Sequence, residues 1–294
     1  MAKTEKKAQN IRNLTWKKRW YRFSRNYMSV IGLVIVVLVI IAAVFAEWIT
    51  PYPEHASAFT DFANANNAPS AAHIFGTDNS GRDIFTRVIF AFRNALKMAV
   101  IVLAISVPVG SVLGIIAGIR QGTWIDTVIM RFTDIFLSVP SMILALAIAS
   151  ILKPKMTNAM LAITVSWWPW YCRLTYSTAR SISRENYVRY AELTGGSFGH
   201  IVFKEILPNC ISPILTKMTL DVGWVIMTGA SLSYVGLGEQ APTPALGNMI
   251  SSGIKYLPDQ WWNTIFPALG IIVIILGFNL LGDGVSDLLA VEEE

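Results

Sequence analysis

Long uninterrupted apolar runs constrain this chain more than any other feature of its sequence. The first run, residues 28–49, contains a single charged side chain, Glu47, close to its end. Because an α-helix rises 1.5 Å per residue, a helix over this run is about 33 Å long, enough to cross the ~30 Å hydrocarbon core of a bilayer. A cleaved signal peptide has a shorter apolar region and a small-residue cleavage site. We therefore expect a retained transmembrane helix over residues 28–49.

Five further runs have the length and composition of membrane spans. They cover residues 97–119, 126–152, 157–175, 211–235 and 264–285. The composition agrees, since the chain is 53% hydrophobic and only 15% charged, whereas a soluble domain is about 25% charged. Pro108, Pro140, Pro169 and Pro267 lie inside these runs, and neighbouring helices must satisfy the carbonyls that such prolines free. The sequence therefore predicts an all-α integral membrane protein, a bundle of six transmembrane helices.

The distribution of basic side chains predicts the orientation of the bundle. Residues 1–27 form a basic arm that contains nine Lys and Arg and several aromatic residues, a mixture typical of an interfacial helix. With both termini in the cytoplasm, the cytoplasmic segments hold sixteen basic residues and the opposite segments hold seven. Cytoplasmic loops carry the excess of Lys and Arg. We therefore expect a cytoplasmic N-terminus and a cytoplasmic acidic tail at residues 291–294.

This orientation places residues 50–96 outside the membrane. Between Asp83 and Asn94, apolar residues recur at spacings of one and four, which give a helix one apolar face. The pattern predicts an external amphipathic helix that lies on the outer interface. Its apolar residues are Ile84, Phe85, Val88, Ile89 and Phe92.

The cytoplasmic segment from residue 181 to residue 208 has the pattern of two short helices around a break. Gly195 and Gly196 permit the positive φ that a helix stop and a sharp turn require. Ser197 is a suitable N-cap for the second helix, and we expect Pro208 to end that helix. Apolar residues along the second helix would anchor it. The segment is therefore predicted to be a helix–turn–helix finger that docks on a partner.

This finger resembles the cytoplasmic coupling loop, or EAA motif, of binding-protein-dependent ABC importer permeases. The motif has a small-residue helix, a Gly and then Leu-Pro at the spacing of Gly195 and Pro208, and residues 187–189 and 206–209 look like its dipeptide/oligopeptide branch. The resemblance implies a set of residues that couple the chain to ATPase subunits. These residues are Tyr187, Val188, Arg189, Ala191, Glu192, Gly195, Gly196, Ser197 and Pro208.

Three other stretches resemble the C-type permeases of the same branch. Residues 73–83 are similar to the external signature before the second span, residues 232–238 to the segment after the fifth span, and residues 279–283 to the end of the last span. The resemblance covers roughly residues 15–290. It implies that residues 97–290 form the importer transmembrane domain that carries the coupling loop.

No Gly-Lys dipeptide occurs in the chain, so it has no G-x-x-x-x-G-K-[ST] phosphate-binding loop. We therefore expect a transport subunit that is not itself an enzyme and holds no cofactor. The resemblance implies two ATP-binding subunits that hold ATP and Mg, a homologous second permease and an extracytoplasmic substrate-binding protein. It also implies the cytoplasmic (inner) membrane of a prokaryote as the location, with the lipid bilayer and no nucleic acid among the partners.

Ionisable and aromatic residues inside the spans are candidates for the transport pathway. Lys217 and Asp221 are four apart in the fifth span, so they share a helix face and can pair. Intramembrane charges are functional-site candidates, although a lysine near the inner boundary also snorkels. The aromatic run at residues 167–170 either lines the pathway or fills gaps between helices. The candidate pathway residues are Trp167, Trp168, Trp170, Asp221 and Met227.

On the outer side, Asp78, Arg82 and Asp83 have two interpretations. The family resemblance implies that they dock the external binding protein. Helix capping and a pair between Asp83 and Arg87 explain the same residues. The three histidines are scattered along the sequence and predict no metal site.

Two alternative functions stay open at this stage. A proton-coupled secondary transporter would use Asp221 and Lys217 and would be built from inverted repeats, which the sequence does not show by inspection. An importer of the same branch would carry nickel chelates, haem or oligosaccharides in place of di- and oligopeptides.

Overall fold

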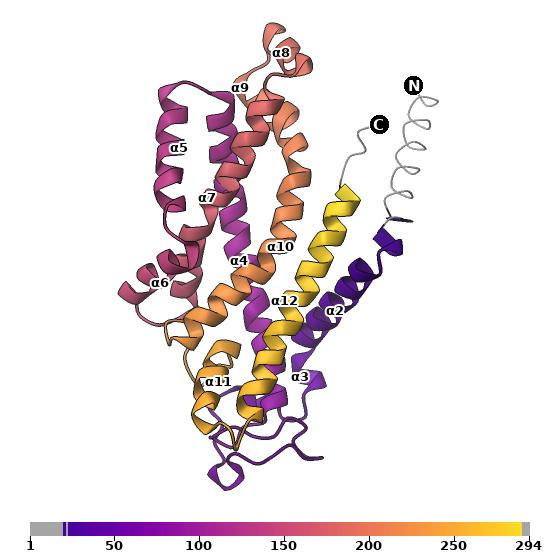
Figure 1. Ribbon diagram of the computed structural model, residues 1–294, viewed down its shortest axis with the longest axis vertical. Helices are drawn as coiled ribbons and strands as arrows, with labels where there is room; N and C mark the ends of the chain where they lie inside the picture. The colour runs from indigo at the N-terminus through magenta and orange to yellow at the C-terminus, as the bar shows by residue number, and fades with distance from the viewer. Residues whose placement is uncertain (1–19, 22, 290–294) are drawn as a thin grey trace.

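The computed structural model describes residues 20–21 and 23–289 (Figure 1). Every named element in those ranges is a helix, so the all-α prediction is confirmed there. The longer helices run along the length of the molecule, with α8 at one end and α11 at the other. The predicted interfacial helix in residues 1–27 lies largely outside the described residues, and the acidic tail at 291–294 lies wholly outside them.

The first and last predicted spans pack side by side. α2 (Tyr27–Val44) begins after Asn26, whose side-chain oxygen accepts a hydrogen bond from the Met28 N–H at 3.1 Å. After a break at Phe45, α3 (Ala46–Ile49) continues in the same run. α12 (Trp262–Leu289) lies along α2 and covers the last predicted span. Both runs are therefore helical where the sequence predicts it.

The prediction for the outer segment needs a correction, because α4 (Ile84–Ile119) is one continuous helix. Its 36 residues extend about 54 Å, roughly 20 Å more than a membrane crossing needs. Residues 83–94 are therefore the cap and first turns of α4 and not a separate helix on the interface. Their apolar face is covered by protein and not by lipid, since Val88 and Phe92 are buried beside α11 (Leu246–Gly253) and α12.

The third predicted span, residues 126–152, is not one helix. α5 (Trp124–Leu137) and α6 (Ser141–Ile151) meet at 85°. Pro140 lies at the break, and a proline disfavours the helical conformation in the residue before it. α7 (Met156–Ile182) then covers the fourth predicted span and continues toward the finger. The predicted span over 126–152 is therefore a pair of helices with a sharp bend at Pro140 and not one continuous helix.

The second helix of the finger and the fifth span form one continuous helix. After α7 the elements are α8 (Asn186–Leu193), α9 (Phe198–His200), the π-helical turn η3 (Ile201–Ile206) and α10 (Leu207–Tyr234). The helix is unbroken from Phe198 to Tyr234, so the prediction that Pro208 ends a helix is wrong. Pro208 directly follows the π turn, where the i→i−4 bonding pattern is already interrupted and a missing N–H costs little.

By length and composition, four helices of the described chain can each cross a membrane. They are α2, α4, the helix Phe198–Tyr234 and α12, and the bent pair α5–α6 makes a fifth if it is one span. α7 is not among them, because Arg173, Arg180 and several aromatic and hydroxyl residues reduce its mean hydropathy. The chain is thus a helical membrane-type protein with four to five strongly apolar helices, and the six-span count is not confirmed by this measure.

A stripe of glycines brings α4 close to α7. Gly110, Gly114 and Gly118 are four apart on one face of α4, and a Cβ on any of them would lie under 3.0 Å from a backbone atom of α7. Small residues at this spacing let helix backbones approach closely in membranes. Across the same contact, the Thr175 hydroxyl donates to the Ser111 carbonyl at 3.1 Å. The stripe therefore fixes the central pair of the bundle.

Replacing a glycine of this stripe tests how far the fold depends on it. We expect Gly114→Leu to lower the free energy of unfolding by about 1–3 kcal/mol, the usual cost of overpacking. The α7 backbone must move to make room for the new side chain. Gly199→Leu is the matched control, since no atom lies within 4 Å of a Cβ at that position. Thermal unfolding in detergent measures both variants. Equal melting temperatures would contradict the proposed role of the stripe.

Candidate functional site

The turn between α8 and α9 has the geometry that its glycines predict. α8 ends in a Schellman arrangement, in which the Gly196 N–H donates to the Ala191 carbonyl at 2.9 Å. Gly195 adopts φ +83°, a left-handed conformation that glycine reaches without steric cost. The Ser197 side chain then accepts a hydrogen bond from the His200 N–H at 3.3 Å. The predicted turn and the predicted N-cap are both confirmed.

The finger is fixed to the bundle and to the end of α4. Val188 of α8 is fully buried in the main core cluster. The Arg120 guanidinium, at the C-terminus of α4, lies 4.9 Å from the centre of the Phe198 ring. Arg184 donates to the Gln121 side-chain oxygen at 3.1 Å. The finger therefore cannot shift far without moving α4.

The tip of the finger exposes large apolar and aromatic side chains. Tyr190, Leu193 and Phe203 are 67%, 82% and 60% exposed, and apolar side chains that gather on one protruding surface are typical of an interaction site. Most of the predicted coupling residues are also accessible. Tyr187, Arg189, Glu192, Gly195, Ser197 and Pro208 are exposed, Ala191 and Gly196 are half-buried, and Val188 is buried.

Inside the bundle, Lys217 and Asp221 of α10 form the predicted pair. The Lys217 Nζ lies 3.2 Å from each Asp221 carboxylate oxygen. The same ammonium lies 5.6 Å from the Trp170 ring centre and 5.5 Å from the Tyr171 ring centre. These aromatic faces on α7 stabilise the cation by cation–π attraction. Sequence reasoning found the pair but not the aromatic residues around it, which come from another helix.

The candidate pathway residues do not share one surface. Lys217, Asp221 and Trp224 line an open groove of about 550 Å³ beside the end of α12. Trp170 and Met227 are about half exposed, whereas Trp167 is buried and Trp168 packs on Phe132 and Phe136 of α5. Trp167 therefore fills a gap between helices. Trp170 and Met227 are accessible from outside this chain, and Asp221 is buried at the wall of the groove.

Separating the charges of the pair tests its contribution to stability. Asp221 has a side chain 5% exposed, and an uncompensated charge at such a position is costly. We expect Lys217→Met to lower the free energy of unfolding by about 3 kcal/mol, and the double variant with Asp221→Leu to lose much less than the two single losses together. Chemical denaturation in detergent measures the cycle, with Lys155→Met, an exposed lysine, as control. Additive losses would show that the two side chains do not interact.

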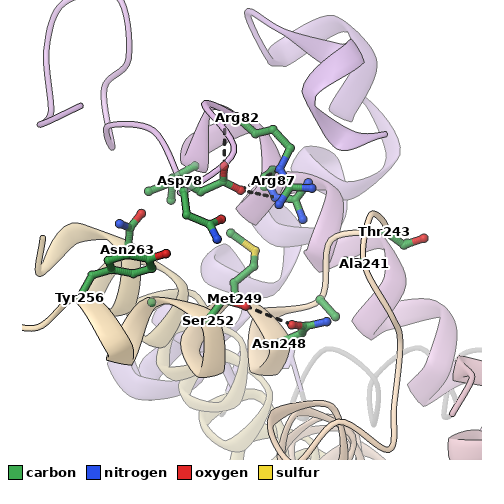
Figure 2. Close-up of a pocket in the computed structure, with 14 residues that line it drawn as sticks. Asp78, Arg82, Arg87, Ala241, Thr243, Asn248, Met249, Ser252, Tyr256 and Asn263 are labelled. Carbon is green, nitrogen blue, oxygen red and sulfur yellow. Dashed lines mark hydrogen bonds and ion pairs between the residues drawn. The ribbon is translucent and has the colours of Figure 1, made fainter. Parts of the chain in front are cut away.

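At the other end of the molecule, Asp78 holds two arginines beside a small pocket (Figure 2). The Asp78 Oδ2 atom lies 2.8 Å from the Arg82 Nε and 3.5 Å from the Arg87 Nε. Arg87, which is 3% exposed, also donates to the backbone carbonyls of His55 and Pro242 at 3.1 and 3.2 Å. The predicted pair between Asp83 and Arg87 is therefore wrong, because Arg87 pairs with Asp78. The remaining lining includes Asn248, Ser252, Tyr256 and Asn263.

Asp83 is buried and serves the start of α4. Its carboxylate accepts a hydrogen bond from the Thr86 N–H at 2.7 Å and lies 3.0 Å from the His73 Nδ1. Its own N–H donates to the His55 Nδ1 at 2.8 Å. The capping interpretation is thus confirmed, and the side chain is not accessible to a docking protein. His55 and His73, far apart in sequence, meet around this residue, which spacing alone does not predict.

Acid should loosen this outer region through His55. Burial lowers the pKa of His55 below 6.5, and its Nδ1 must be unprotonated to accept the Asp83 N–H. The unfolded chain therefore binds the proton more readily. The stabilisation is fully present above pH 6.5 and is lost as the pH falls toward the lower pKa of the folded state, with a slope no steeper than about 1.4 kcal/mol per pH unit.

Unfolding measured from pH 7.5 down to pH 5 tests this expectation. His55→Asn is the matched variant, because its amide oxygen can accept the same hydrogen bond and does not titrate. We expect its pH dependence to be flatter than that of the unmodified protein. Parallel curves for the two proteins would exclude His55 as the source of the acid sensitivity.

In the described part of the chain, no group of three or more His, Cys, Asp or Glu side chains is arranged to hold a metal ion. The two cysteines, Cys172 and Cys210, are both buried and unpaired with each other.

Comparison with protein families gives two matches. Residues 110–291 match the family described as binding-protein-dependent transport system inner membrane component. Residues 15–69 match the N-terminal transmembrane domain of oligopeptide transport permease C. Together the two matches include α2, the last ten residues of α4 and all of the finger.

Individual relatives agree with these families. The chain is 38% identical over 274 residues to the dipeptide transport system permease protein DppC of Alkalihalophilus pseudofirmus, with 93% of this chain and 89% of that protein covered. It is 38% identical over 262 residues to the probable D,D-dipeptide transport system permease protein DdpC of Escherichia coli, with 89% and 87% covered.

Among solved structures, the MetNI methionine ABC transporter in an inward-facing conformation contains a chain of similar fold. The TM-score is 0.55 at 17% sequence identity, and the similarity covers 70% of this chain and 98% of the MetNI chain. At this identity the likeness concerns the fold alone.

Proposed function

The chain belongs to the family of binding-protein-dependent transport system inner membrane components, and from that membership we propose that it forms half of the translocation pathway of an ATP-driven importer. The printed names of its relatives refer to dipeptide transport, and we propose di- and oligopeptides as the substrates. One observation carries the mechanism. The second helix of the finger, from Phe198 onward, is continuous with α10, the helix that holds Lys217 and Asp221.

The proposed mechanism converts movement at the finger into movement of α10. Two separate ATP-binding subunits, which hold ATP and Mg, would each receive one finger and draw the fingers together when they close. Because the helix is unbroken from Phe198 to Tyr234, a displacement of the second helix of the finger would reach the groove beside Asp221 without an intervening loop. The contacts of Arg120 and Arg184 would carry the same displacement to α4 and the α4–α5 connection.

A homologous second permease would complete the pathway. Lys217, Asp221 and Trp224 face an open groove, so in a pair of permeases this face of α10 would border the space between the two chains. Six spans, with α5–α6 and α7 counted as spans, would place both termini in the cytoplasm, as the basic residues predict. α7 lies against α4 along its length, and protein contacts of this kind make a polar helix tolerable in a membrane.

The outer pocket is the proposed docking region for an extracytoplasmic substrate-binding protein. Asp78 and Arg82 reach its edge, and together with Arg87 they leave one uncompensated positive charge beside polar groups of α11 and η4 (Ile254–Tyr256). Asp83 supports the site from beneath by capping α4. A rim of this kind contributes mainly to the rate and orientation of docking.

Crosslinking of the finger tip tests the proposed coupling. The native cysteines are buried, so a new surface cysteine reports on its own contacts. In the assembled transporter, we expect Leu193→Cys, at the most exposed position of the tip, to crosslink to an ATP-binding subunit. Ile74→Cys, 58% exposed at the opposite end, is the control and should not.

A charge at the same position should uncouple transport. We expect Leu193→Asp to reduce ATP-driven uptake at least tenfold, because roughly 1.4 kcal/mol of lost apolar contact already gives a factor of ten, with the amount of folded protein unchanged. Uptake into proteoliposomes measures it. A crosslink from Ile74→Cys to the ATP-binding subunit, or full uptake by Leu193→Asp, would contradict the proposal.

The buried carboxylate of Asp221 supports a second candidate, a proton-coupled carrier. That function requires uptake that persists without ATP and collapses when an uncoupler dissipates the proton gradient. ATP-driven importers show the reverse dependence. Uptake by the purified assembly in proteoliposomes, with ATP or with a proton gradient, separates the two functions.

A further inference from the structure

An apolar groove on the outer surface of the helix bundle is not used by the proposed mechanism. Its volume is about 870 Å³, and it lies between α2, α4, α10 and α12. The walls are aliphatic and aromatic along its whole length, and the charged lining side chains, Arg93 and Lys97, lie at one end only. Representative wall residues are Ile40, Val100, Ala104, Val107 and Phe278.

The position of Lys97 along α4 places that end at the membrane surface. From Ile119, the last residue of α4, back to Lys97 is about 33 Å of helix, close to the ~30 Å thickness of the hydrocarbon core. α2 indicates the same membrane boundary independently, because its 18 residues extend about 27 Å, close to the thickness of the hydrocarbon core. Its last residue, Val44, receives a hydrogen bond from Arg93 at 3.2 Å. Lys97 therefore lies at the level of lipid headgroups.

The groove ends about halfway through the bilayer. Along α4 the lining runs from Arg93 to Pro108, and the part below Lys97 is about 16 Å long. One leaflet contributes about 15 Å to the hydrocarbon core. A transmembrane helix would need a surface that crosses the whole core, whereas an acyl chain of one leaflet needs only this length.

The two basic residues at the mouth are not equivalent. The Arg93 guanidinium is already bonded to the Glu47 carboxylate at 3.0 Å and to the Ala43 carbonyl at 2.8 Å. Lys97 is exposed and makes no hydrogen bond or ion pair with any residue in the ranges 20–21 and 23–289. An ammonium at the headgroup level above an apolar groove is complementary to an anionic phospholipid.

We infer that the groove is a binding site for an anionic phospholipid, with the phosphate at Lys97 and one acyl chain extending along α4 to Pro108. The site stabilises the contact of α4 with α2 by covering apolar surface that protein leaves open. Only the name of the leaflet, the outer one, rests on the proposed orientation. The lipid contact itself is independent of ATP and of transport.

Photocrosslinking in the assembled transporter tests the site. The probe is phosphatidylglycerol with a diazirine at the end of one acyl chain, compared with phosphatidylcholine that carries the same chain, each in vesicles of otherwise identical composition. We expect phosphatidylglycerol to label residues 100–108 of α4. Lys97→Gln should reduce the labelling about fivefold, the loss expected for one cation near a membrane surface, and Lys97→Arg should retain it.

Two further variants separate the parts of the site. Ala104→Trp, at an exposed position of the groove wall, should block labelling by filling the groove while Lys97 stays in place. Lys255→Gln, an exposed lysine away from the groove, should leave labelling unchanged. Equal labelling by both lipids, no effect of Lys97→Gln, or crosslinks from Ala104→Cys to the second permease would overturn the inference. If the unmodified assembly shows no ATP-driven uptake but is labelled as expected, only the proposed function is contradicted.

Discussion

In the centre of the bundle, α4 and α7 approach each other through the glycine face of α4, and the positions of the other helices follow from that contact. Water is absent from the hydrocarbon core, so helices gain no hydrophobic driving force from packing against one another there. Close van der Waals contact and interhelical hydrogen bonds replace it. Gly110, Gly114 and Gly118 provide the first, and Thr175 provides the second by donating to Ser111.

The same pair determines where the functional groups lie. α7 carries Trp170 and Tyr171, whose rings face Lys217 on α10. Arg120, directly after α4, lies over Phe198 at the start of the finger's second helix. One contact between two helices thus orients both the charge pair inside the bundle and the exposed tip at its end.

The finger differs from an ordinary loop because it is continuous with a long helix. The π turn at Ile201–Ile206 continues into α10 without ending the helix, and Pro208 lies in the first turn of α10. Such π turns are frequent at functional positions. In the proposed mechanism this construction lets a partner move α10 without first having to order a flexible segment.

Sequence reasoning succeeded where the signal is local. The Schellman turn at Gly195, the Ser197 cap, the Asp83 cap and the pair of Lys217 with Asp221 all depend on residues within four or five positions of one another. Their geometry follows from backbone conformation and helix periodicity.

Prediction from the sequence failed where the structure depends on packing between distant segments. Pro108, Pro169 and Pro267 stay inside helices, whereas Pro140 lies at an 85° break. All four prolines give the same local signal in the sequence, so that signal does not distinguish the break from the continuous helices. The pairing of Arg87 with Asp78, and of the Asp83 N–H with His55, joins a long outer loop to a helix. The spacing of residues along the sequence does not predict which residue of the loop meets which residue of the helix.

The central claim is that the finger and the cytoplasmic half of α10 move as one body when ATP binds. Spin labels at Leu193 and Ile211, both exposed, measure it by pulsed electron resonance in the assembled transporter. The account predicts an unchanged distance between these two positions on ATP binding, and a changed distance between Leu193 and the matching finger of the second permease. A changed distance between Leu193 and Ile211, with the two fingers stationary, would contradict it.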